Sequence, residues 1–262
     1  MASRAALVSD TLPGTLPNSP GRTAFDAGSG QAMPSRMERG STRPFSALGV
    51  DVKVGVGGIG FDAATPLGYK FNLRGGAAFF NYSLSNLTED GFNINGTIAL
   101  KSITGSLDWF PFGGSFRISP GVTIYNGNRF DGTASVPPGD TITLNDQDYT
   151  SSPTDPLIAT FATQNNRFGS RVAPSITTGF GNLIPRGGGH WSVPFEIGFQ
   201  YISPPKITLA LTGTACSTDG CQSVNSDPTT IANIQAQQAK INGDIYNLRF
   251  YPIFSIGLGY KF

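Results

Sequence analysis

Charged residues are scarce in this sequence, and the motifs of most enzyme classes are missing. Asp, Glu, Lys and Arg make up 13% of its 262 residues, against about 25% in a typical soluble domain. A net charge of +1 argues against nucleic acid as a partner. No run of about 18 apolar residues exists, so no transmembrane helix is expected. Phosphate loops, metal-ligand clusters and nucleophile elbows are missing too, so we expect no cofactor, no metal and no enzymatic activity.

Cysteine and histidine are nearly absent. Cys216 and Cys221 lie five positions apart, and the one histidine, His190, is remote from them in the sequence. A zinc site needs more ligands than this pair supplies. Two closely spaced cysteines in an oxidising compartment are typical of a small loop disulfide. We therefore predict a Cys216–Cys221 disulfide on an external loop.

Glycine and aromatic residues are abundant, with 34 glycines and an aromatic content of 11%. Together with the low charge, they favour an all-β protein in which apolar residues alternate with small or polar ones. Residues 1–44 have no such alternation and are rich in Pro, Gly, Ser, Thr and Arg, so we expect a disordered lead or linker there. This lead has no apolar segment typical of a secretory signal. Either the signal precedes it, or the true start of the chain differs.

From residue 45 to 262, apolar residues alternate with period two, which predicts β-strands. The apolar parity flips after Gly57-Gly58, which requires a bulge or a turn there, and it changes again near Ser102. Dividing the segment 50–65 at the glycine pair gives eight strands, and an even number is the rule for single-chain bacterial barrels. The predicted strands are 50–56, 59–65, 69–79, 92–109, 116–124, 172–180, 191–201 and 248–262.

The connections between these strands alternate between short and long. We expect tight turns at 66–68, 111–114 and 185–189, and long or polar segments at 84–91, 127–166 and 204–244. The segment 127–166 has room for a hairpin of its own. Outer-membrane barrels sort their connections this way, with short periplasmic turns and longer external loops. In lipid every backbone group needs an internal partner, so we predict a closed antiparallel transmembrane β-barrel over residues 45–262. A soluble β-sandwich is the alternative.

One short helix is expected in the last long loop. Asp227 can cap its N-terminus, and Pro228 suits the first helical position. Either the helix caps or plugs the mouth of the barrel, or it packs on its own hairpin, and we prefer the second interpretation. Four isoleucines fall near one helical face: Ile231, Ile234, Ile241 and Ile245.

Four prolines lie inside predicted strands, where each removes a hydrogen-bond donor from the ladder. All four fall on the apolar, outward parity, and we expect bulges or bends at their positions. They are Pro120, Pro174, Pro194 and Pro252.

The inward parity carries eight basic and four acidic residues. The interior of an eight-stranded barrel is just wide enough for side chains to fill it, and buried charges must pair. We therefore predict a salt-bridge network made of Asp51, Asp62, Arg74, Asp108, Arg117, Arg171, Glu196 and Arg249. The four lysines on the same parity can extend toward the wet ends of the barrel: Lys53, Lys70, Lys101 and Lys261. Alternatively, the surplus positive charge lines a passage that favours anions.

The C-terminal stretch 250–262 resembles the C-terminal signal of Gram-negative outer-membrane proteins. Alternate apolar or aromatic residues run through Tyr260 to the terminal Phe262. The resemblance implies recognition by the barrel-assembly machinery. In organisation, the whole segment 45–262 is similar to small OmpA-like or porin-family barrels, and residues 107–117 resemble a strand–turn–strand found in uncharacterised members of that group. This implies a monomer in the cell outer membrane, surrounded by lipid and lipopolysaccharide.

Three functions are compatible with such a barrel. The first is a structural or binding scaffold with a charged, largely plugged lumen, which we prefer. The second is a narrow porin or channel for small solutes. The third is a lipid A-modifying enzyme, because His190-Trp191-Ser192 has the His-x-Ser spacing of outer-membrane lipid A deacylases. This tripeptide follows a predicted periplasmic turn, whereas those enzymes work at the outer leaflet, so an interfacial histidine beside a girdle tryptophan is the preferred interpretation.

Overall fold

The computed structural model describes residues 43–89, 92–218 and 220–262. The lead expected at 1–44 lies, apart from its last two residues, outside this part of the chain. Among the described residues, no helix is both long and apolar enough to cross a lipid bilayer.

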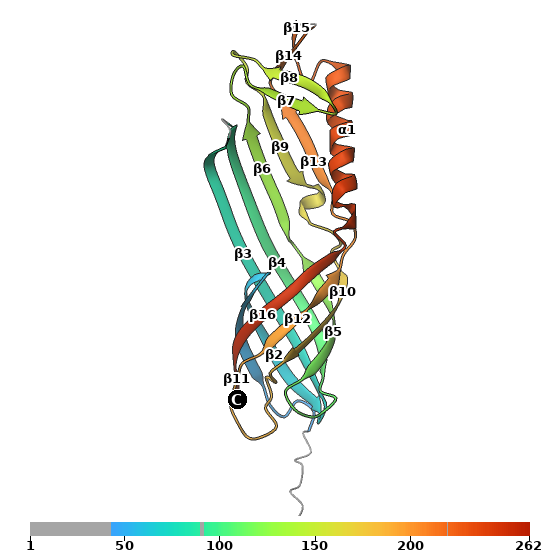
Figure 1. The fold of residues 1–262 in the computed structure, drawn as a ribbon. Coiled ribbons are helices and arrows are strands. Elements are labelled where there is room, and N and C mark those ends of the chain that lie inside the picture. The colour runs from blue at the N-terminus through green and yellow to red at the C-terminus, as the bar shows by residue number, and fades with distance from the viewer. Residues whose placement is uncertain (1–42, 90–91, 219) are drawn as a thin grey trace, which may run out of the picture. The chain divides into compact units, whose positions relative to one another are not determined.

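Eight antiparallel strands form a closed barrel, as the alternation predicts (Figure 1). Each strand pairs with the next around the ring, and the last strand returns to pair with the first along Gly49–Gly55. A two-residue strand, β11 (Trp191–Ser192), also pairs with β16. In ring order the strands are β1 (Gly49–Gly55), β2 (Gly58–Gly68), β3 (Phe71–Glu89), β4 (Phe92–Trp109), β5 (Arg117–Asn126), β10 (Ala173–Phe180), β12 (Phe195–Tyr201) and β16 (Phe250–Lys261).

The glycine pair at 57–58 divides two strands, as expected. Gly58 has a φ of +95°, which suits glycine, and an added Cβ would lie 2.4 Å from the carbonyl oxygen of Phe79. The expected turn at 66–68 is wrong, because a register shift between Pro66 and Gly68 lets β2 continue to Gly68. The turn follows at residues 69–70. The loop expected at 84–91 is also wrong, because β3 and β4 stay paired through a second register shift up to Glu89 and Phe92.

The apolar face of β3 and β4 changes sides halfway along each strand. The lower half is the half nearer the chain's C-terminus in Figure 1, and its outer face is apolar, with Leu73, Phe79, Ile103 and Leu107. In the upper half the outer face is polar. The two strands stay in continuous register across this change, so the parity change near Ser102 is not a slip of the chain. The side chains keep alternating, and it is the environment of each face that reverses. The upper inner face is apolar, with Phe80, Tyr82, Leu84, Ile94, Ile98 and Leu100.

Above the barrel, the upper half of β4 continues into an external sheet. β6 (Arg129–Ser135), β9 (Ile158–Thr163) and β13 (Ile207–Thr212) extend it in that order. A second, four-stranded sheet contains the hairpin expected within 127–166. Its strands are β7 (Thr141–Leu144), β8 (Gln147–Ser151), β14 (Thr214–Ser217) and β15 (Gly220–Ser223). Between these sheets and the helix lies a core cluster of Val136, Leu144, Tyr149, Leu157, Leu211, Ala215 and Val224. Two short 3-10 helices, η1 (Gln164–Asn166) and η2 (Ile245–Asn247), complete the described elements.

The expected helix is α1 (Pro228–Asp244), and Asp227 caps it by accepting hydrogen bonds from the N–H groups of Thr229 and Thr230. It lies along β13 at the open edge of the external sheet (Figure 1). Gln238 accepts a hydrogen bond from the N–H of Leu209 at 2.8 Å. Asn242 both accepts from the N–H of Ile207 and donates to its carbonyl. Two amide side chains four residues apart thus satisfy the backbone of an edge strand that would otherwise be exposed.

Three of the four strand prolines lie in regular ladders, so the expected bulges are wrong there. The physical reason is that each of these prolines is unpaired with one of its two neighbouring strands. Pro120 faces the gap in the β4–β5 pairing, Pro174 lies beyond the pairing with β12, and Pro252 lies beyond the pairing with β1. No donor is lost where no acceptor strand is paired. Pro194 does interrupt its strand, and it separates β11 from β12.

Candidate functional site

A network of buried ions crosses the middle of the lumen, with Arg74 at its centre. Its Nη1 lies 2.8 Å from Asp62 Oδ2 and 2.8 Å from Glu196 Oε2. Its Nη2 lies 3.1 Å from Asp108 Oδ1. The three carboxylates come from β2, β4 and β12, and all four residues are at most 6% exposed. A single guanidinium therefore ties together four of the eight strands.

The remaining charges of this network extend it toward both ends of the barrel. Arg117 donates to Glu196 at 3.2 Å and lies 4.0 Å from Asp108. Lys53 pairs with Asp62 at 2.7 Å, and Asp51 accepts a hydrogen bond from the N–H of Asp62 at 3.0 Å. The hydroxyls of Ser119 and Thr177 donate to Asp108 and Glu196. Such dense pairing is what makes ionised groups tolerable in a buried site.

Two arginines expected in the network do not join it. Arg249 stacks over the ring of Tyr246, 4.2 Å from its centroid, and donates to the Tyr201 hydroxyl at 3.5 Å. Arg171 is exposed. Both residues precede their strands, β16 and β10, so the period of two that places side chains inside or outside does not apply to them. Lys101 also departs from expectation, because it pairs with Phe79 on the outer face. The sequence therefore placed six of the eight network residues on the inner walls of the lumen, where the structure has them. Its error was to extend the alternation beyond the ends of β10 and β16.

The connection after β10 folds back under the lumen, which the sequence analysis missed. Leu183 and Ile184 are 3% and 2% exposed. An added Cβ on Gly49 would strike the backbone of Leu183, and one on Gly259 would strike its side chain, so this leucine lies against the inner walls of β1 and β16. Arg117 holds the start of the loop by donating to the carbonyl of Gly181 at 2.6 Å. An apolar pair between Gly181 and Pro185 was the available sequence signal.

Polar side chains fix this loop to the opposite wall. Asn72 on β3 is fully buried and donates to Asn182 at 2.9 Å. Arg186 donates to the side-chain oxygen of Asn72 at 2.7 Å and to the carbonyl of Gly68. Lys261 donates to the carbonyl of Pro185 at 3.2 Å. The loop is therefore bonded to β2, β3, β5 and β16.

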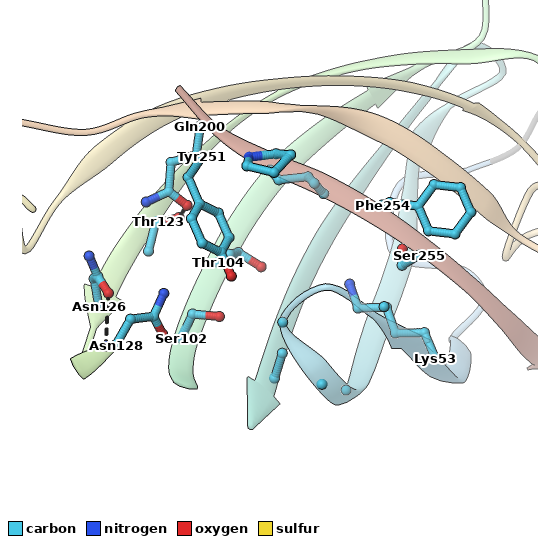
Figure 2. A pocket seen from close by; sticks show the side chains of 17 residues that line it. Lys53, Ser102, Thr104, Thr123, Asn126, Asn128, Gln200, Tyr251, Phe254 and Ser255 are labelled. Carbon is cyan, nitrogen blue, oxygen red and sulfur yellow. Dashed lines mark hydrogen bonds between the residues drawn. The ribbon is translucent and has the colours of Figure 1, made fainter. Parts of the chain in front are cut away.

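Above the ion network the lumen widens into a small vestibule of about 90 Å³ (Figure 2). Among the described residues that line it, Lys53 is the one charged residue, and the others carry hydroxyls, amides or apolar groups. The ring of Tyr251 lies among Gln200, Thr123 and Thr104, whereas Phe254 points away from them (Figure 2). Thr123 donates to Gln200 at 2.8 Å. This vestibule can offer hydrogen bonds to a polar group, and the ion network lies beneath it.

The His190-Trp191-Ser192 tripeptide does not form a nucleophile and base pair. The Nδ1 atom of His190 lies 2.9 Å from the carbonyl oxygen of Lys261, and its ring stacks on Tyr260 at 5.6 Å. Among the described residues, the buried Ser192 hydroxyl has no hydrogen-bond partner. A catalytic serine needs a base within hydrogen-bond reach, and this geometry does not provide one.

The disulfide between Cys216 and Cys221 is present, as predicted, and it joins β14 to β15.

At the other end of the molecule, the C-terminal strand ends in a cluster of outward-facing rings. Tyr260 contacts both Trp191 and Phe262, with ring centroids 5.0 and 5.1 Å apart. Phe262 is 69% exposed. Of the two residues of the predicted assembly signal, Phe262 is therefore accessible at the lower rim, and Tyr260 is half-buried among the neighbouring rings.

No protein-family model and no curated protein sequence matches this chain. The solved structures that are similar to it include two from Acinetobacter baumannii. The crystal structure of CarO from Acinetobacter baumannii is 21% identical, with a TM-score of 0.55, over 84% of this chain and 98% of that chain. The crystal structure of Acinetobacter baumannii CarO2 is 19% identical, with a TM-score of 0.55, over 84% of this chain and 100% of that chain. At this level of identity the likeness shows a CarO-like barrel fold.

Proposed function

We propose that this protein is an outer-membrane β-barrel with a closed lumen, which serves as a structural or binding scaffold through its external sheets. The observation that carries the membrane assignment is the reversal of the apolar face along β3 and β4. A barrel in lipid is apolar outside and polar inside, and a sheet in water buries its apolar face instead. The lipid band is the part of the barrel whose apolar outer face lies in the membrane. The reversal between Phe79 and Phe80 supports an upper edge of this lipid band at that level.

The position of the aromatic rings supports the same band. Trp109, Trp191 and Tyr260 lie on the outer face near the lower turns, and Tyr125, Tyr201 and Phe250 lie near the upper ends of their strands. Such rings are typical of both membrane–water interfaces. The short connections at the lower end and the two sheets at the upper end support a periplasmic and an external side. CarO, whose barrel this chain resembles in fold, is an outer-membrane barrel protein.

A cationic rim at the upper edge of the band supports lipopolysaccharide as the lipid partner. Arg171 and Arg249 precede β10 and β16 at this edge, and Lys101 lies on the outer face just above Ile103. Arg129 lies on the same face and is paired with Asp131 at 3.2 Å. Basic side chains pair with phosphate groups through charge-assisted hydrogen bonds. The two arginines that are missing from the lumen thus acquire a role at the membrane surface. The exposed Phe262 supports recognition by the barrel-assembly machinery, and a barrel that closes on itself supports a monomer.

The closed lumen follows from two barriers in series, the ion network at Arg74 and the apolar pair Leu183 and Ile184 beneath it. A channel for small solutes is the second candidate, favoured by the vestibule that opens above the network. Single-channel recording of the refolded protein in planar bilayers separates the two. We expect at most small, sporadic conductance from the wild type. Stable, large, salt-dependent steps would promote the channel to first place.

A matched pair of variants locates the barrier. The double substitution Leu183→Ala and Ile184→Ala should raise the frequency of the sporadic events, because it thins the lower barrier only. The control pair Val52→Ala and Val54→Ala shortens two exposed outer-face residues of β1 and should leave the recording unchanged. Equal behaviour of both double variants would show that Leu183 and Ile184 do not limit the conductance and that the ion network is the barrier.

A further inference from the structure

An apolar hollow of about 450 Å³ opens on the inner face of the external sheet, above the vestibule. Its wall is formed by side chains on four adjacent strands, β3, β4, β6 and β9. Three of these side chains are far more exposed than core residues: Tyr82 at 53%, Ile98 at 39% and Phe130 at 40%. The lining residues are Tyr82, Leu84, Ile94, Asn95, Gly96, Ile98, Phe130, Gly132, Thr133, Ala134 and Phe161.

The strand register explains why the sheet is hollow at this point. Tyr82, Ile98 and Phe130 stand side by side in one row across three strands. In the next row, Gly96 and Gly132 stand side by side between Leu84 and Phe161. Two glycines on neighbouring strands leave a floor without side chains between two rows of larger ones. The hollow is therefore a product of sequence and register together.

The described residues of the protein cover only part of this apolar face. Higher up the face, the core cluster packs against Ala159 and Ile234. Lower down, the same inner face continues through Ala78 and Ser102 into the vestibule. The open part lies between them, and its volume falls within the range of about 300–1,000 Å³ that is usual for small-molecule pockets. A protein partner would need a surface of about 800 Å² on each side, so the hollow fits a small apolar group.

We infer that the hollow binds the apolar chain of a single-chain amphiphile, whose uncharged polar head lies in the vestibule. The two parts face the same side of the same strands, since Ile98 and Ser102 are four residues apart on the inner face of β4, or about 13 Å along the strand. The vestibule presents hydroxyls and amides from Ser102, Thr123 and Gln200, and Lys53, the one cation in its described lining, is already paired with Asp62. A hydroxylated head group matches these partners, and the apolar hollow matches the chain.

The inference deepens the binding role proposed above and depends on it only for the external position of this face. Its test is photo-labelling of the full protein in lipid nanodiscs with a monododecanoylglycerol that carries a diazirine in its chain, followed by mass-spectrometric mapping of the labelled residues. We expect label on the inner face, at Tyr82, Ile98 or Phe130, in addition to label on outer-face residues such as Phe79 and Ile103. The outer-face label reports the probe dissolved in the bilayer and serves as the internal reference.

Two leucine substitutions on one strand make the matched comparison. An added Cβ on Gly96 would lie 3.8 Å from its nearest neighbour, the carbonyl oxygen of Asp131, so Gly96→Leu can fill the hollow without moving the backbone. Gly105 lies on the outer face of the same strand with no atom within 4 Å of such a Cβ. Gly96→Leu should lower the inner-face label at least fivefold relative to the reference, and Gly105→Leu should leave it unchanged.

Three outcomes would overturn the inference. They are label confined to outer-face residues, inner-face label that persists in Gly96→Leu, and inner-face label that excess unlabelled monododecanoylglycerol does not reduce. Heat-shifted mobility on a denaturing gel shows that each variant is folded before it is scored. Failure here would leave the membrane band and the closed lumen untouched, because bilayer recording and the outer-face label test those separately.

Discussion

Arg74 and Glu196 stand on opposite walls of the barrel and still meet. Arg74 is on β3 and Glu196 on β12, four strands apart around a ring of eight, yet Nη1 and Oε2 are 2.8 Å apart. The pair therefore spans the full width of the lumen at this level. An aqueous passage at this level needs this contact to open, and the contact therefore supports the proposed closed lumen.

Replacing Glu196 by Gln should lower the free energy of unfolding by about 3–5 kcal/mol, because it removes one partner of a buried pair and leaves Arg74 and Arg117 undercompensated. Urea titration of the folded protein in detergent micelles measures this. Gln200→Ala is the control and should cost clearly less, because Gln200 is uncharged and lies four residues higher on the inner face of the same strand. An unchanged midpoint, with altered ion selectivity in bilayer recordings, would instead support the channel.

The reversal of the apolar face predicts opposite responses at two isoleucines of β4. Ile103 lies on the outer face within the proposed lipid band, so Ile103→Arg should cost about 2–4 kcal/mol of barrel stability in lipid. Ile98 lies five residues higher on the inner face, 39% exposed, and Ile98→Arg should cost much less. Refolding yield and urea titration in lipid vesicles measure both. Equal costs would place the membrane edge elsewhere.

The folded protein should migrate differently from the boiled protein on a denaturing gel. A closed ladder from β1 to β16 has no free edge at which detergent can begin to separate strands. The comparison requires protein shown to be folded by its β-type circular dichroism. Identical mobility before and after boiling would argue strongly against a closed barrel and would favour the soluble sandwich.

Helix α1 should loosen at low pH. The hydroxyl of Thr230 and the N–H groups of Thr229 and Thr230 hold the pKa of Asp227 below its usual value. A carboxyl whose pKa is lower in the folded state stabilises the fold above its unfolded pKa, about 3.9, and this contribution disappears as the pH falls through the folded value. Hydrogen exchange of amides in residues 231–238 should therefore accelerate below about pH 4. In Asp227→Asn, whose cap does not titrate, this acceleration should be absent.

Reducing the Cys216–Cys221 disulfide should leave the barrel intact. The ring that it closes spans a sequence separation of five, and so short a loop loses little chain entropy when cross-linked. Thiol titration of envelope-isolated protein should find no free cysteine before reduction. After reduction, heat-shifted mobility should persist, and only proteolysis of the β14–β15 hairpin should increase. Loss of the folded band on reduction would show that the hairpin supports the barrel.

The local features of this protein can be predicted from its sequence. Alternation with period two is a property of each strand alone, so the eight strands, the turn at Gly57-Gly58 and the inward direction of Asp62, Arg74 and Glu196 could be predicted. The cap at Asp227 and the disulfide depend on residues a few positions apart, and both are present. Where the alternation ends, at Arg171 and Arg249, the same reasoning placed side chains in the lumen that lie outside it.

Which residues from distant strands come into contact depends on the tertiary structure. Closure of the ring sets β3 opposite β12 and so brings Arg74 to Glu196, and no period in either strand contains that information. The register of β4 against β6 places Gly96 beside Gly132 and makes a hollow of two separate glycines. The return of Leu183 beneath the ion network depends on the space that the inner walls leave free there. The alternation within each strand sets the direction of a side chain, whereas closure of the barrel and the register between strands set which residues it contacts.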